Sequence, residues 1–226
     1  MQSILISCFI CAYRRYKLKK GKISIMNINM KDKYIPGTRV SKDEMHGITG
    51  KEFLDKIFFM SDGIMLNRIR DIAGIDGSTI QNWVKRGWLG STVNKRYSEV
   101  QLARILIINM LRTTMKLEKI DFLLHYINGN LDNRADDIIS EPILYEYICK
   151  ITDRIDGSES VTPDQIREII FRETSGYKEQ ISGAADRLRN ALEVILLSYF
   201  ASIVSSYSEE KFSAIKSGKA IFPVQI

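Results

Sequence analysis

A basic stretch without acidic residues lies between two helical patterns, and it constrains the fold of this chain more than any other feature. Residues 81–96 contain four lysines or arginines and no aspartate or glutamate. A short helix is predicted over Asp76–Arg86, because its first residue is a good N-cap and because Ile80 and Trp83 share one helical face. Residues Gly90–Tyr97 follow without an apolar period, which predicts a polar hairpin that ends in Lys, Arg and Tyr.

Two more helices are predicted after this hairpin. Ser98 and Gln101 have the spacing of a capping box, which marks the start of the first helix. Residues 100–111 are apolar on nearly every side, so we expect this helix to be buried at the centre of the fold. Residues 117–127 carry one apolar face and predict the second helix. The predicted fold class is therefore mostly α.

Charge is unevenly distributed along the chain, whose net charge is +6. Residues 66–127 hold ten lysines and arginines against five acidic residues, whereas residues 128–176 hold eleven acidic residues against five basic ones. The first region suits a polyanion and the second would repel one. Two differently solvated surfaces would also explain the difference.

A short helix followed by a basic hairpin is how a winged helix-turn-helix domain meets DNA. We therefore expect Asp76–Arg86 to be a recognition helix in the major groove of double-stranded DNA, with Gly90–Tyr97 as a basic wing on the phosphate backbone. A solvated surface is the alternative explanation for the polar face of this helix. The predicted DNA-binding residues are Ser78, Gln81, Asn82 and Lys85 in the groove, and Arg86, Lys95 and Arg96 on the phosphates.

The order of these elements resembles the DNA-binding domain of the mercury-resistance-regulator (MerR) superfamily. More closely, the chain is similar to the bacterial domain of unknown function family 1836 in the segments MSDGIMLNRIRDIAGIDGSTIQNWVKRGWL, VNKRYS, IINMLR and LLHYING, within roughly Phe53–Ile151. This resemblance implies a transcriptional regulator. The chain departs from the MerR pattern at Gln81, where those proteins usually carry a phosphate-binding arginine, and at Lys116, where they have a capping serine.

An interaction adaptor, whose degenerate winged helix binds protein, is the alternative function. The missing arginine at Gln81 and the acidic second half of the chain favour it. We expect no enzyme, because the chain has no catalytic or phosphate-binding motif and its only histidines are His46 and His125. Cys8 and Cys11 lack further zinc ligands nearby in the sequence, so we expect neither a metal nor a cofactor.

Five segments are predicted along the chain. Residues 1–30 are expected to be a disordered tail or an over-called start, 31–62 an N-terminal helical segment, 63–128 the MerR-like winged helix-turn-helix, 129–210 a helical accessory or dimerisation region, and 211–226 a tail. The apolar run near the start is shorter than the about 20 residues that span a membrane. We therefore expect a cytoplasmic protein without membrane contact.

Apolar residues between Ile181 and Tyr199 are spaced four and three apart in turn, as in a coiled-coil seam. A homodimer through Ile181–Tyr199 would suit a regulator that binds an inverted repeat. The alternative is that the same residues pack against their own chain, since the seam covers fewer heptads than a coiled coil needs. The sequence indicates neither an operator nor an effector.

Overall fold

The computed structural model describes residues 33–129, 136–156 and 162–218. The predicted tail 1–30, with Cys8 and Cys11, lies outside these residues, and so does the end of the predicted tail 211–226.

Helices dominate the described residues, as the sequence predicted. Two short strands, β1 (Ile64–Met65) and β2 (Arg96–Tyr97), pair antiparallel, with Ile64 opposite Tyr97. The helices are α2 (Gly50–Phe58), α3 (Leu66–Ala73), α4 (Gly77–Lys85), α5 (Glu99–Leu111), α6 (Leu117–Asn128), α7 (Glu141–Asp156), α8 (Pro163–Glu173) and α9 (Ala184–Lys216).

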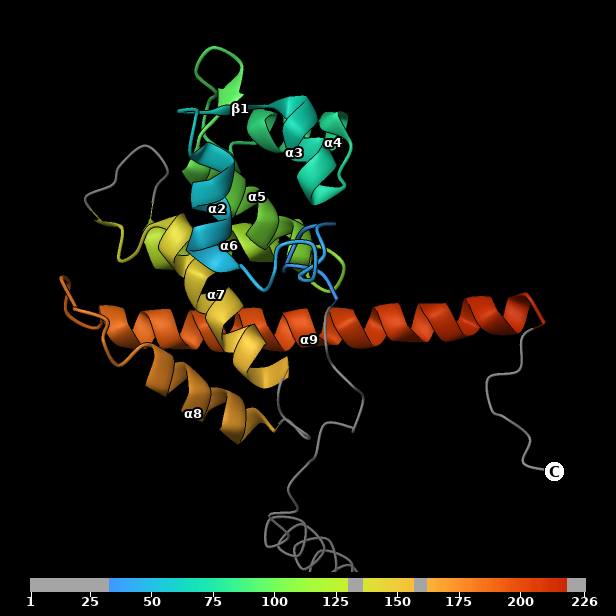
Figure 1. Ribbon diagram of the computed structural model, residues 1–226. Coiled ribbons are helices and arrows are strands. Elements are labelled where there is room, and N and C mark those ends of the chain that lie inside the picture. Colours follow the sequence, from blue (N-terminus) through green and yellow to red (C-terminus); the bar gives the residue numbers. More distant parts are fainter. Residues whose placement is uncertain (1–32, 130–135, 157–161, 219–226) are drawn as a thin grey trace, which may run out of the picture.

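Helix α5 lies at the centre of the fold, where α2, α3, α6, α7 and α9 contact it (Figure 1). Its residues 102–108 are all buried, which confirms the prediction of a central helix. The predicted capping box is also confirmed. The N–H of Gln101 donates to Oγ of Ser98 at 3.3 Å, and the N–H of Ser98 donates to Oε1 of Gln101 at 2.9 Å. The start of the central helix is thus fixed by its own sequence.

The segment before α2 is not helical, although the sequence predicted a helical segment over 31–62. Residues 33–49 form turns, and only α2 in this region is an α-helix. Residues Ile35–Arg39, here called the N-terminal turn, lie against α3, α5 and α7. Ile35 is fully buried, and Tyr145 of α7 donates a hydrogen bond from its hydroxyl to the carbonyl oxygen of Pro36 at 2.7 Å. The buried carbonyl and side chain tie this turn to the core.

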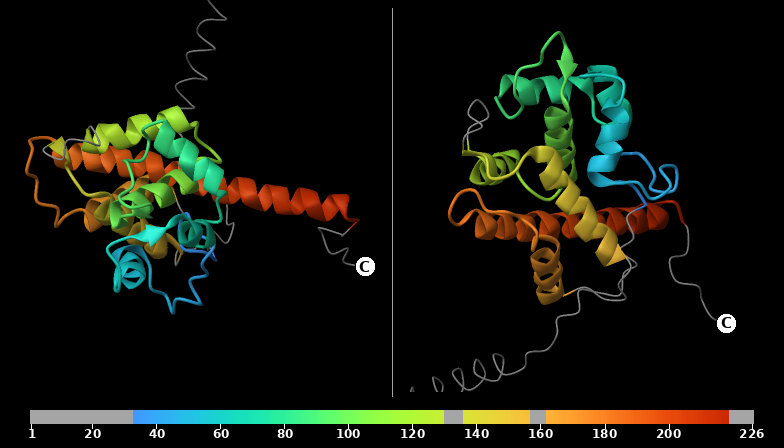
Figure 2. Two further views of the ribbon diagram at one scale, coloured as in Figure 1. Left: turned by 90° about the horizontal axis from the view of Figure 1, so that it is seen from above. Right: turned by 60° about the vertical axis from the view of Figure 1, so that its left-hand side comes forward.

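Helix α9 runs along one side of the other helices, and its second half projects away from them (Figures 1 and 2). The predicted seam is mostly buried within the same chain, because Leu188, Leu192, Ile195 and Tyr199 belong to the core beside α5, α6 and α8. Most of the seam therefore packs against its own chain, which is the alternative that the sequence left open. The helix also continues to Lys216, so the prediction of a tail from residue 211 was wrong.

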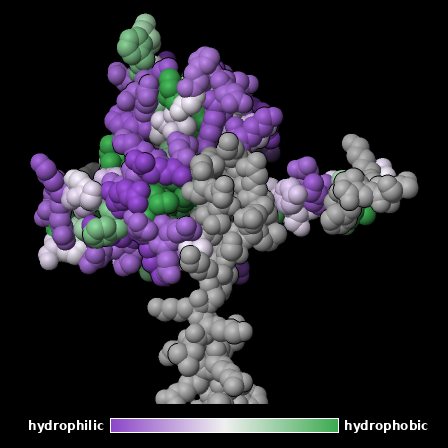
Figure 3. Space-filling model, turned by 60° about the horizontal axis from the view of Figure 1, so that its bottom comes forward, coloured by the Kyte–Doolittle hydropathy of each residue, from purple (hydrophilic) through white to green (hydrophobic). Residues whose placement is uncertain are grey.

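By length and composition alone, α9 could cross a membrane. Its most apolar window of 18 residues has a mean hydropathy of 1.4, and 39% of that window is buried inside the protein. Helices in the cores of other proteins pass the same test, so this is weak support for a membrane span. The space-filling view shows a largely hydrophilic face with smaller hydrophobic areas (Figure 3).

Candidate nucleic-acid interface

Helices α3 and α4 are joined by a tight turn at Gly74–Asp76. Gly74 has a φ of +66°, which glycine adopts without strain, and its N–H donates to the carbonyl oxygen of Arg70 at 2.8 Å. Ile75 is buried, which fixes the turn against the core. Asp76 occupies the predicted N-cap of α4, but the predicted side-chain cap is absent, since its carboxylate makes no cap hydrogen bond.

Helix α4 ends at a glycine that turns the chain away from the helix axis. Gly87 has a φ of +77°, and its N–H donates to the carbonyl oxygen of Val84 at 3.0 Å. The N–H of Trp88 donates to the carbonyl oxygen of Trp83, also at 3.0 Å. This pair of bonds is a Schellman motif, which turns the chain sharply away from the helix. The glycine thereby sets the direction in which the basic hairpin leaves α4.

Helix α4 separates a buried face from an exposed one, as predicted. Ile80 and Trp83 are buried in the core. The exposed face presents an amide, a hydroxyl and an ammonium group, which are the hydrogen-bonding groups that base edges and phosphates accept or donate to. Its members are Ser78, Gln81, Asn82 and Lys85.

Residues Gly90–Tyr97, here called the basic hairpin, turn at Asn94 and Lys95. Both residues have positive φ angles, of 51° and 59°, and Val93 pairs with Arg96 on either side of them. Two consecutive positive φ angles define a type I′ turn, the turn that suits a tight hairpin. Lys95 is therefore held at the tip of the hairpin, exposed to solvent.

The two strands are not the pair that the sequence suggested. We expected Gly90–Tyr97 to form a hairpin by itself, whereas β2 forms its ladder with β1 and the first arm contributes only the bridge at Val93. The side chain of Gln101 binds the first arm. Its Nε2 donates to the carbonyl oxygens of Gly90 at 2.6 Å and Ser91 at 3.3 Å. One glutamine thus caps α5 and anchors the hairpin.

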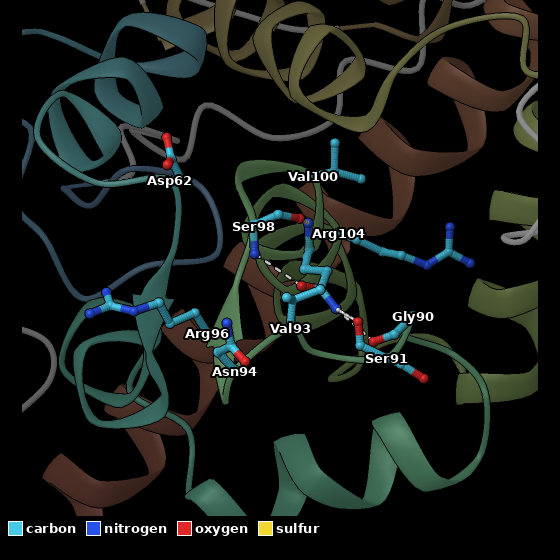
Figure 4. A pocket seen from close by; sticks show the side chains of 10 residues that line it. Asp62, Gly90, Ser91, Val93, Asn94, Arg96, Ser98, Val100 and Arg104 are labelled. Carbon is cyan, nitrogen blue, oxygen red and sulfur yellow. Dashed lines mark hydrogen bonds between the residues drawn. The ribbon is translucent and has the colours of Figure 1, made fainter.

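A buried arginine supports the hairpin from below. Nε of Arg104 donates to the carbonyl oxygen of Trp88 at 2.7 Å, and its Nη1 lies 3.2 Å from Oε1 of Glu141, at the start of α7. Asp121 of α6 lies 3.8 Å from Nη2. Figure 4 shows the Arg104 and Arg96 side chains pointing in opposite directions from the hollow of about 490 Å³ beside the hairpin. Arg104 therefore joins the chain between α4 and the hairpin to two other helices.

The structure brings some of the predicted site residues together and uses others within the fold. Gln81, Lys85 and Lys95 line one hollow of about 700 Å³ between α4 and the basic hairpin. Nη1 of Arg96 donates to the carbonyl oxygen of Gly63 at 2.8 Å, so part of that guanidinium holds the chain before β1. The guanidinium of Arg86 lies over the ring of Trp88, 5.1 Å from its centre. Lys85 and Lys95 are thus the predicted cations that face this hollow together.

A third hollow, of about 300 Å³, lies on the other side of α4. Thr79 and Trp83 of α4 line it together with Arg112 and Lys116 of the segment between α5 and α6. Glu118 of α6 lines it too, so the two cations outnumber one carboxylate there. At 3.6 residues per turn, Thr79 and Trp83 point roughly opposite to Gln81, which lines the hollow between α4 and the basic hairpin. The exposed face of α4 therefore has cations on both sides. The sequence prediction missed Arg112 and Lys116 as candidate contacts, because only the fold places them beside α4.

Groups that could bind a metal ion or act as a nucleophile were also sought among the described residues. Residues 33–129, 136–156 and 162–218 contain no cluster of three or more His, Cys, Asp or Glu side chains that could hold a metal ion. Cys149 is buried, and this burial raises its thiol pKa from 9.0 to about 12. A thiol with so high a pKa stays protonated at neutral pH and is a poor nucleophile.

Comparisons with known proteins identify a domain but no function. Residues 53–148 match the family model described as domain of unknown function, DUF1836. The chain is 26% identical over 145 residues to the uncharacterized protein YkrK of Bacillus subtilis (strain 168), in an alignment that covers 60% of this chain and 62% of YkrK. The chain therefore matches less than two thirds of the length of that relative. No solved structure matches the chain.

Proposed function

We propose that this protein is a DNA-binding transcriptional regulator with a MerR-like winged helix-turn-helix. The observation that carries the proposal is the polar face of α4 with cations on both sides. Lys95 lies on the hairpin side, and Arg112 and Lys116 lie on the other. A helix in the major groove, about 12 Å wide, has a phosphate backbone on each side, so this distribution of charge suits duplex DNA.

Each element then has a role in binding. Helices α3 and α4 act as the helix-turn-helix, with α4 as the recognition helix, and the basic hairpin acts as the wing. Gln81 and Asn82 carry amides, which form paired hydrogen bonds with adenine in the major groove. Ser78 and Lys85 contact phosphates or base edges beside them. Arg86 and Arg96 are also proposed to contact phosphates. They would do so through guanidinium N–H groups that form no hydrogen bond within the protein.

We also propose that the regulator binds an inverted repeat as a homodimer in the cytoplasm. Because most of the seam within Ile181–Tyr199 is buried in its own chain, we place the proposed dimer contact on the projecting half of α9. Tyr207, Phe212 and Ile215 are exposed there. An isolated helical segment of roughly 16 residues is only marginally stable in water, so a second copy would stabilise it. The acidic helical region after Asn128 would receive a signal that the sequence does not identify.

A salt titration of the full chain against DNA tests this proposal. Labelled fragments that include the region upstream of its own gene are titrated at several salt concentrations. Six cationic phosphate contacts per protomer, from Lys85, Arg86, Lys95, Arg96, Arg112 and Lys116, predict a log–log slope of about −5 per protomer. Lys95→Glu should weaken binding to all sequences and reduce the slope by about 1 or more.

The matched control is Lys178→Glu, which makes the same change in charge between α8 and α9, far from α4. Its affinity should equal that of the unchanged protein. Binding no tighter than that of any equally basic protein, or equal losses in the two variants, would contradict the proposal.

An adaptor that binds protein is the second candidate, and one observation favours it. Met65, with 53% of its surface exposed, lines the hollow between α4 and the basic hairpin together with Leu66. Exposed apolar side chains in a hollow are typical of contacts with other proteins. If the adaptor function is correct, Met65→Ser should abolish capture of a partner protein, whereas Lys95→Glu should have little effect.

A further inference from the structure

We propose that Arg39, in the N-terminal turn, is an additional phosphate contact that extends the DNA-binding surface beyond the segment matched by the domain family. This inference rests on the proposed function. It adds a second element, from outside residues 53–148, to the side of α4 that faces away from the basic hairpin.

The N-terminal turn is held in place on two sides. Gly37 has a φ of +76°, and a Cβ atom there would collide with the backbone of Leu106 in α5, lying 2.9 Å from its carbonyl carbon. Nδ2 of Asn109 donates to the carbonyl oxygens of both Gly37 and Ala73, at 2.9 Å each. The amide of Asn109 thus ties the N-terminal turn to the end of α3.

The same contacts fix where Arg39 begins. Its N–H donates to the carbonyl oxygen of Ile72 at 2.8 Å, so its backbone is bonded to the last turn of α3. Its side chain lies across Gly74, where a Cβ atom would come within 2.7 Å of Cγ of Arg39. Gly74 begins the turn that leads into α4 at Gly77. The Arg39 side chain therefore lies beside the turn that leads into the proposed recognition helix.

The charge of Arg39 is available to a ligand. Arg39 is exposed, and within the described part of the chain it forms no ion pair. Lys42, three residues later, instead lies 2.9 Å from Asp153 of α7. An exposed arginine without an ion-pair partner attracts an anion such as a phosphate.

Arg39 also has cationic neighbours on this side of α4. Nε of Arg112 donates at 2.8 Å to Oδ1 of Asn109, the residue whose amide touches Ala73 and Gly37. Arg112 in turn lines the hollow of about 300 Å³ with Lys116. Arg39 and Arg112 therefore approach the end of α3 from two different segments of the chain. A continuous phosphate strand along this side would meet both guanidinium groups.

Phosphate ethylation interference on a bound promoter fragment, with affinities at several salt concentrations, tests this inference. The variants are Arg39→Gln and Lys95→Gln in the full chain. Lys33→Gln is the matched control, because Lys33 is exposed in the same segment but lies next to Lys42, on the α7 side. Thermal unfolding of each variant checks that the fold is unchanged.

We expect Arg39→Gln to lower the affinity roughly three- to tenfold and to reduce the salt slope by about 1. It should remove interference at phosphates on one flank of the site, whereas Lys95→Gln should remove interference on the other flank. Lys33→Gln should behave as the unchanged protein does.

The outcomes separate this inference from the proposed function. If Lys95→Gln weakens binding and Arg39→Gln does not, the inference about Arg39 is overturned and the regulator remains. Loss of interference on the same flank for both variants also overturns it. If the unchanged protein gives no saturable binding, the proposed function itself fails.

Discussion

Replacement of Gly37 by alanine should destabilise this protein strongly, because two separate costs fall on one methyl group. The first is the positive φ of +76°, which costs an alanine about 1–2 kcal/mol. The second is the collision with the backbone of Leu106, where overpacking costs about 1–3 kcal/mol. Displacing the turn also breaks the hydrogen bond from Asn109 to Gly37, worth about 1 kcal/mol.

Gly47→Ala isolates the second cost from the first. Gly47 lies in the same segment with a φ of +79°, but a Cβ atom there would meet no atom within 4 Å. Gly37→Ala should therefore be less stable than Gly47→Ala by about 2–4 kcal/mol. For a domain of this size the difference corresponds to roughly 5–15 °C in Tm.

Urea unfolding followed by tryptophan fluorescence measures this difference directly, since Trp83 is buried in the same half of the protein. Equal free energies of unfolding for Gly37→Ala and Gly47→Ala, within about 0.5 kcal/mol, would refute the packing of the N-terminal turn against α5. The position assigned to Arg39 would then lose its support.

Three further predictions concern buried groups. Glu141→Ala should lower the free energy of unfolding by about 3–5 kcal/mol, because it leaves the charge of Arg104 buried without this carboxylate, and Glu141→Leu combined with Arg104→Met should recover most of the loss in urea unfolding. Gln101→Leu should weaken DNA binding in the salt titration, because the carbonyl groups at the base of the hairpin lose their donor. Because burial raises the pKa of Cys149, its contribution to the free energy of unfolding is fully present below about pH 9 and is lost as the pH rises towards 12. The loss is at most about 1.4 kcal/mol per pH unit. Cys149→Ala should reduce this loss.

Each of these has an outcome that contradicts it. Equal free energies of unfolding for Glu141→Ala and the double variant would show that the unpaired charge of Arg104 is not what destabilises Glu141→Ala. DNA affinity unchanged in Gln101→Leu would mean that the hairpin position does not matter for binding. A thiol at Cys149 that reacts readily with an alkylating reagent in the native protein at pH 8 would show that it is not buried.

Local features of this fold were predictable from sequence, because they depend on residues a few positions apart. The capping box of Ser98 and Gln101 is one case, and the box of Thr162 and Gln165, with bonds of 2.9 and 3.3 Å, is another. The buried face of α4 also followed from helical periodicity. Asp76 shows the limit of such rules, since it has the right position for a cap without the side-chain bond.

Features that join distant segments were not predictable. Arg104 and Glu141 are 37 residues apart, and no pattern in the sequence indicates an ion pair between them. Arg112 and Lys116 counted only as charge, because nothing in their spacing places them beside α4. The seam in α9 illustrates the same limit, since its periodicity fits a dimer contact and an internal helix contact equally well. Only the tertiary structure shows that most of the seam is buried within its own chain.

Selection of bound duplexes from a random-sequence pool tests the central claim most directly. The unchanged protein and the double variant Gln81→Ala with Asn82→Ala are compared at one moderate salt concentration. Readout by the exposed face of α4 predicts that the unchanged protein enriches one sequence motif, and that the variant loses preference at specific positions of that motif while keeping its general affinity for DNA. No enriched motif, or the same motif selected by both proteins, would contradict sequence recognition by α4.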